Sequence, residues 1–178
     1  MTVLAICYTM IIPFLPIYLL ELGVPKADVA LWSGLVFGIT FLIAGIMAPI
    51  WGKIADNKGK KRMALRAGFG IAICYVLIGL VTDQYQLLMG RALVGFANGF
   101  YPAAMTMVSL SVDEKQVGRA LGIFQTGLIL GNVIGPFLGG AVESVVGMRP
   151  VFYVSGVAVL IATLAVLFFV KEPKLHAV

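Results

Sequence analysis

Few side chains in this chain are ionisable, and one of them, Arg91, falls well inside a long apolar segment. Placing a charge at the centre of a bilayer costs roughly 2.5–3.5 kcal/mol on insertion scales, so this side chain should face protein or water. Small or polar residues recur at helical spacing with it: Gly95, Asn98, Pro102, Met105 and Ser109. This stripe favours a functional charge. The alternative is an arginine that extends to the nearby membrane surface.

A second group of charges lies at the connections between apolar segments. Asp56 stands among several lysines and arginines, so it is not expected to be a lone charge. Two pairings are available with the connection near position 115: Asp56 with Arg119, and Lys60 or Lys61 with Asp113. Exposed ion pairs contribute only about 0–1 kcal/mol, which is enough to bias two conformations of similar energy. A solvated basic loop explains the cations equally well but leaves the acid unexplained.

Residue types that support catalysis or metal binding are scarce. His176 is the only histidine, and Cys7 and Cys74 both fall inside apolar segments. These residues form no nucleophile–base pair and no disulfide or metal framework. We therefore expect no enzyme activity, no cofactor and no metal.

A glycine-rich segment, GLILGNVIGPFLGG (127–140), lies inside one apolar run. In lipid, helices tolerate glycine and proline where neighbouring helices pack closely. The spacing predicts a flat stripe on one helix face, a bend at its proline, and contact with a partner helix at a point that has to move. The alternative is an ordinary packing seam of small residues. The residues concerned are Gly127, Gly131, Gly135, Pro136, Gly139 and Gly140.

Composition and length then give the fold class. Of 178 residues, 61% are hydrophobic and 12% are charged, which is far from a soluble domain. A helix crosses the hydrocarbon with about 20 apolar residues, so we predict an all-α integral membrane bundle of six helices in a domain at 1–170. The predicted spans are 3–22, 29–51, 63–82, 86–110, 118–141 and 150–170. The first span has no polar lead-in, so we expect the start of its helix to be missing. Residues 171–178 are expected to open a cytoplasmic linker.

Basic residues collect on one side of this topology, whereas the other side has Lys26 and Arg149. Because cytoplasmic loops are rich in lysine and arginine, both termini are predicted to be cytoplasmic in a multi-pass plasma-membrane protein. The net charge of +5 then reflects contact with the lipid bilayer rather than with nucleic acid. Ten of the 13 basic residues share that side: Lys53, Lys58, Lys60, Lys61, Arg62, Arg66, Lys115, Arg119, Lys171 and Lys174.

A weak internal sequence repeat relates the two halves of the chain. The order glycine, acid, glycine, arginine between spans 2 and 3 recurs between spans 5 and 6, at 139–149. The two connections should face opposite sides of the membrane. Two three-helix units related by a 3+3 inverted repeat produce this arrangement, which is common in transporters.

These motifs resemble those of the major facilitator superfamily. GKIADNKGKKR (52–62) is similar to its signature between spans 2 and 3, through Gly52, Asp56, Gly59, Lys60 and Lys61. The segment at 131–140 resembles the fifth-helix signature of drug antiporters, and Leu87, Arg91 and Gly95 match the fourth-helix motif.

The resemblance implies that the chain is the amino-terminal half of a twelve-helix transporter for proton-coupled efflux of hydrophobic or cationic drugs. It implies that Asp56 helps to latch one conformation against a carboxy-terminal six-helix half, and that Arg91 takes part in proton handling. A self-associated dimer is the other source of a second half. A sugar or amino-acid transporter, and a membrane assembly protein without transport activity, are the alternatives.

Candidate cavity residues are aromatic or carry an amide. Gln125 and Asn132 share one face of the predicted fifth helix, and Asn98 lies two turns from Arg91. No carboxylate falls in the middle of a span, so a buried acid that carries protons must be a residue near the rim or lie in the second half. The candidates for binding a small hydrophobic substrate are Tyr8, Phe37, Asn98, Tyr101, Gln125 and Asn132.

Overall fold

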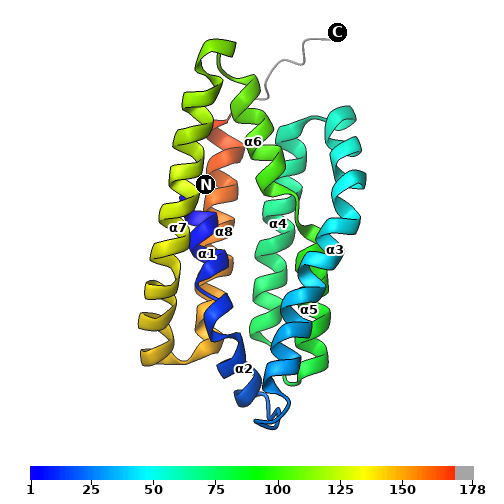
Figure 1. Cartoon of the computed structure of the whole chain (residues 1–178), viewed down its shortest axis with the longest axis vertical. Coiled ribbons are helices and arrows are strands. Elements are labelled where there is room, and N and C mark those ends of the chain that lie inside the picture. Colours follow the sequence, from blue (N-terminus) through cyan, green and yellow to red (C-terminus); the bar gives the residue numbers. More distant parts are fainter. Residues whose placement is uncertain (171–178) are drawn as a thin grey trace.

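Six segments of the described residues 1–170 are long and apolar enough to cross a membrane, as predicted. In the computed structural model they run up and down side by side, joined by short turns (Figure 1). The predicted linker at 171–178 lies outside the described residues. The elements are α1 (Thr2–Thr9), η1 (Ile12–Phe14), α2 (Leu15–Glu21), α3 (Val29–Lys58), α4 (Lys60–Gly79), α5 (Gln84–Ala97), α6 (Phe100–Leu110), η2 (Glu114–Gln116), α7 (Val117–Val146) and α8 (Met148–Phe169).

The basic segment at 52–62 is almost entirely helical, so the expected loop there is wrong. α3 continues to Lys58 and α4 begins at Lys60, which leaves Gly59 alone to reverse the chain. Gly59 has φ +96°, a conformation that residues with a Cβ rarely adopt. Gly52 lies inside α3, where an added Cβ would meet nothing within 4 Å, and it takes no part in the turn.

The chain follows the same plan twice. α3 and α7 are uninterrupted helices of 30 residues, and Gly147, with φ +79°, alone joins α7 to α8. The two single-glycine turns lie at opposite ends of the bundle (Figure 1). In addition, α1 packs on α7, α3 on α5, and α4 on α8. Exchanging the first three spans with the last three preserves these pairings, as an inverted repeat requires.

The first span of each unit is broken, whereas the sequence predicts a single span at 3–22 and at 86–110. Pro13 and Pro16 open η1 and α2, where their missing N–H groups are tolerated. The fourth span stops at Ala97 and restarts at Phe100, with Gly99 at φ +133° between them. Both spans are therefore built from separate helical pieces.

The glycine-rich segment packs closely against α1. A Cβ added at Gly131 would lie 2.6 Å from the carbonyl oxygen of Thr2, and one at Gly135 would lie 2.8 Å from that of Ile6. Thr9 donates its hydroxyl to the carbonyl of Gly131 at 3.2 Å. The partner of this stripe is thus α1, and α7 remains helical through Pro136.

We expect Gly59→Ala to lower stability by about 1–3 kcal/mol, because its backbone conformation is accessible almost only to glycine. Thermal unfolding of the purified protein in detergent measures the change. Gly52→Ala is the matched control, since its site is helical and open, and it should leave the unfolding temperature unchanged or slightly raised. Equal effects of the two substitutions would contradict the role of Gly59.

We expect Gly139→Ala to destabilise the bundle by about 1–3 kcal/mol through overpacking. Its added methyl group would meet the main chain of Met10, which cannot move aside as a flexible side chain can. Gly122→Ala, on the same helix with open space around it, is the control. If the two variants unfold at the same temperature, the α1–α7 seam is looser than described.

Candidate substrate cavity and buried arginine

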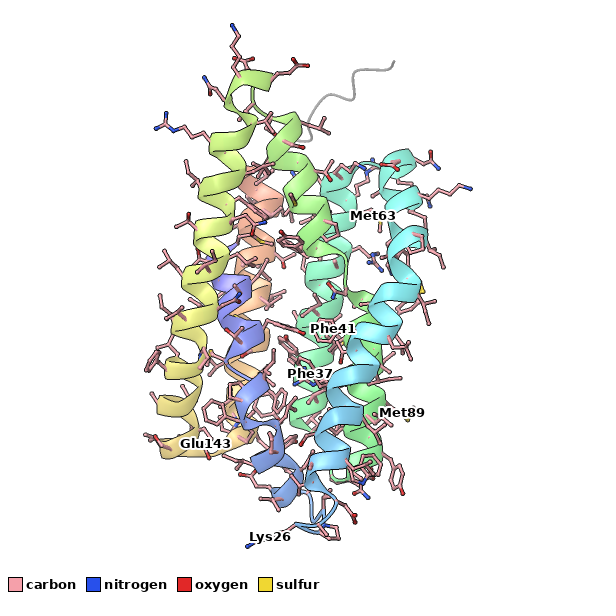
Figure 2. All side chains as sticks on the ribbon, viewed as in Figure 1. Lys26, Phe37, Phe41, Met63, Met89 and Glu143 are labelled. Atoms are coloured by element: carbon pink, nitrogen blue, oxygen red, sulfur yellow. The ribbon has the colours of Figure 1, made fainter. Side chains whose placement is uncertain are left out.

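A cavity of about 390 Å³ lies in the bundle, and all six spans contribute to its wall. Figure 2 shows Phe41, one of its lining residues, near mid-height and projecting from α3 toward α1, with Phe37 close by. Tyr8 of α1 meets the Phe41 ring edge-on, at 6.5 Å between centroids. The wall is mainly apolar and aromatic, which suits a hydrophobic ligand.

Most of the predicted cavity residues meet at this site. Tyr8, Asn98, Tyr101 and Asn132 line the cavity. Gln125 donates its amide N–H to the hydroxyl of Tyr101 at 2.7 Å, and so orients a lining side chain.

Phe37 does not line the cavity. It packs instead on Phe41, with 4.9 Å between the ring centroids, and so supports one wall. None of the lining residues is an aspartate or glutamate. The polar groups of the wall are therefore amides, phenols and backbone groups, which fix orientation through hydrogen bonds.

Arg91 is enclosed by the bundle, with only 2% of its surface exposed. The Arg91 side chain therefore does not extend to the membrane surface. Its Nε and Nη2 have no hydrogen-bond partner among the described residues. The titratable side chains near it are the phenols of Tyr75 and Tyr8, both in the cavity wall. Burial of a cation without an ionic partner is costly, which suggests a functional reason for Arg91 at this position.

The packing of α5 on α3 holds Arg91 in this position. Thr40 donates its hydroxyl to the Arg91 carbonyl at 3.2 Å and to the Val36 carbonyl of its own helix at 3.2 Å. One turn further on, a Cβ at Gly95 would lie 2.5 Å from the Thr40 carbonyl oxygen. The small residues of the predicted stripe thus allow close approach of the two backbones.

The charged groups at the basic end, where α3 meets α4 and α6 meets α7, pair differently from the prediction. Asp56 forms its ion pair with Lys60, four residues along the chain, and not with Arg119. Lys61 donates to the Leu167 carbonyl of α8 at 2.8 Å. Asp113 and Arg119 belong to the α6–α7 connection, which lies apart from the tip of α3 (Figure 1). Asp56 pairs with Lys60 rather than with Arg119 because the Gly59 turn already places Asp56 and Lys60 next to each other.

Sequence reasoning missed two residues, Trp51 and Arg66. The sequence predicts only that Arg66 lies on the basic side of the membrane, whereas in the structure it lies in α4 and stacks on the Trp51 ring, 3.6 Å from its centroid. A second cavity, of about 310 Å³, lies beside them and is lined by Trp51, Gly52, Lys60 and Asn98 among others. The signal that could have located this contact is Asn98-Gly99 followed by Pro102, because a glycine and a proline together favour a break in the helix.

Comparison with known proteins agrees with this architecture. A model of the Major Facilitator Superfamily matches residues 1–178. The multidrug resistance protein MdtG of Proteus mirabilis (strain HI4320) is 44% identical over 166 residues, which is 93% of this chain and 41% of that protein. MdtG of Dickeya zeae (strain Ech586) is 41% identical over the same shares. The chain therefore spans about two fifths of the length of these relatives.

Two solved structures share the fold. The human organic anion transporter MFSD10 (TETRAN) superposes with a TM-score of 0.83 at 17% identity, covering 97% of this chain and 45% of that one. A peptide transporter (POT), solved in complex with sulfate, gives 0.80 at 18% identity, covering 93% and 35%. The family match over the whole length decides the assignment: this chain belongs to the major facilitator superfamily, a family of membrane transporters and not of enzymes.

Proposed function

We propose that this chain forms the amino-terminal half of a proton-coupled exporter of small hydrophobic compounds. The observation that carries the proposal is the cavity walled by all six spans, with aromatic rings and amide groups and an unpaired arginine beside it. Relatives at 41–44% identity are named multidrug resistance proteins, which supports export of such compounds.

A second six-helix half completes the transporter in this proposal, either as a following domain or as a second copy. The apolar side chains exposed on α3 and α7, such as Leu42 and Phe137, support it, because such surfaces face lipid or another helix. The two halves would rock against each other around the cavity, which opens alternately to each side.

The basic end faces the cytoplasm of the plasma membrane in this proposal. Lys58, Lys60 and Lys115 lie there, whereas Lys26 and Glu143 lie at the opposite end of the bundle (Figure 2). Cytoplasmic connections collect lysine and arginine, so both termini take the same side.

Asp56 and Arg91 take separate roles in the cycle. The Asp56 side chain is 68% exposed, whereas that of Lys60 is 12% exposed. The Asp56 carboxylate can therefore contact a second half while Lys60 keeps its largely buried position. Arg91 is buried, and its Nε and Nη2 have no hydrogen-bond partner among residues 1–170, so it can respond when a carboxylate elsewhere in the transporter gains or loses a proton. In this proposal, Asp56 biases the conformational equilibrium, and Arg91 couples that equilibrium to proton binding.

Efflux of a fluorescent hydrophobic dye from cells that express the complete transporter tests the function. We expect efflux to stop when an uncoupler collapses the proton gradient, and to be lost in Asp56→Asn at normal membrane expression. Asp28→Asn, an exposed aspartate at the other end of α3, should leave efflux intact. Wild-type efflux by Asp56→Asn would remove the latch, and efflux that persists without a proton gradient would remove the coupling.

The cavity assignment predicts that Tyr101→Phe raises the KM for the dye by about two- to tenfold, because it removes a hydroxyl worth one hydrogen bond. Gln125 then loses the acceptor that orients it. Initial efflux rates over a range of dye concentrations measure the change. Tyr85→Phe, on an exposed ring near the other end of the fourth span, is the control. An unchanged KM for Tyr101→Phe would place the binding site elsewhere.

A further inference from the structure

The break in the fourth span is held by side chains from two other spans. It lies at Asn98–Gly99, between α5 and α6. Asn98 is extended, with φ −56° and ψ 161°, and Gly99 has φ +133°. Pro102 and Gly99 together favour a break here: the proline ring has no N–H for the Asn98 carbonyl, and Gly99 permits the positive φ.

Three consecutive backbone carbonyls at the break receive hydrogen bonds from only two side chains. Trp51 of α3 donates its indole N–H to the Phe96 carbonyl at 2.8 Å. Arg66 of α4 donates from Nη2 to the Ala97 and Asn98 carbonyls, each at 3.2 Å. Because nothing in the hydrocarbon can replace these donors, non-helical backbone at this depth depends on them.

The two donors also hold each other. The guanidinium of Arg66 lies 3.6 Å from the centroid of the Trp51 ring, in a cation–π contact. The Trp51 ring packs edge-on against Phe96, with 5.2 Å between centroids. Stacked together, the two side chains form a clamp that fixes the joint against α3 and α4 at once.

Asn98 connects this clamp to the transport path, because it lines both cavities. The 390 Å³ cavity carries the proposed substrate site, and the 310 Å³ cavity extends toward Lys60 and Thr106 near the basic end. Asn98 is therefore shared by the walls of both cavities, beside the joint at Gly99.

We infer that Arg66 is a positioning residue for transport: with Trp51 it clamps the Asn98–Gly99 joint, and the cycle requires the clamp to hold and release this joint. The inference rests on the proposed transport function. Arg66 does not touch the substrate in this arrangement. It acts through the position of Asn98 and of α6, so it should govern the rate of the cycle more than the affinity for substrate.

Arg66→Lys tests the clamp, because lysine keeps the charge and loses the planar group that stacks and bonds two carbonyls. We expect the maximal efflux rate of the complete transporter to fall about tenfold, the effect of losing one charged hydrogen bond. The KM should change by less than about twofold, because the substrate wall remains. Arg62→Lys, an exposed arginine one turn earlier on α4, is the matched control.

The labelling rate of a cysteine placed at Thr106 reports on the position of α6. If Arg66 only stabilised the fold, Arg66→Lys would leave this rate unchanged. Thr106 lines the second cavity, and the native Cys7 and Cys74 are buried. A membrane-impermeant maleimide should react with this cysteine at a different rate in Arg66→Lys than in the parent. Trp51→Phe keeps a ring but removes the indole donor, so it should shift rate and labelling in the same direction, and it carries the test if Arg66→Lys fails to fold.

Removing the joint gives the opposite test. In Gly99→Ala/Pro102→Ala the fourth span can form a continuous helix, so the Asn98 carbonyl gains its ordinary donor and folding no longer needs Arg66. We expect a stable protein whose maximal efflux rate is lost. Normal efflux in this double variant, or normal rates and labelling in folded Arg66→Lys, would overturn the inference. A wild-type protein that moves no substrate would instead contradict the proposed function itself.

Discussion

Backbone satisfaction in lipid is the constraint on which this structure depends. Each N–H and C=O inside the hydrocarbon needs a partner within the protein, and continuous helices provide one for nearly all of them. Where a span is interrupted, a side chain must replace the missing partner. Trp51 and Arg66 do so at the joint in the fourth span.

The same constraint explains how rigid and segmented spans are distributed. α3 and α7 are continuous over 30 residues each, although Pro49 and Pro136 each remove one backbone donor from them. The first and fourth spans are interrupted, and each packs along one of these two continuous helices through glycines. Interruptions therefore occur in the two spans that the repeat makes equivalent, and both of these spans line the main cavity. Continuous helices thus support interrupted ones. This arrangement suits the proposed cycle, in which the substrate cavity opens alternately to each side of the membrane.

Sequence patterns predicted the features that depend on local chemistry. Six apolar runs became six spans, the glycine stripe of α7 found a close partner, and four of the six candidate cavity residues line one cavity. The partner of Asp56 was not predictable from charge alone, since Lys60 and Arg119 are both cations and only the single-residue turn decides between them. The contacts of Arg66 were missed for the same reason, because composition identifies a cation but not the carbonyls that it meets.

Charge balance beside the cavity supports the proposal that a second six-helix half completes the transporter. The guanidinium of Arg91 is buried with two nitrogens unpaired among the described residues, and no carboxylate lines the cavity beside it. Removing an ionised group from water costs several kcal/mol unless an opposite charge or hydrogen bonds compensate. A carboxylate outside this cavity wall is the natural counter-charge, and its protonation would release Arg91. In the proposed transporter, coupling between protons and substrate then depends on the contact between the two halves, around which the proposed alternating access takes place.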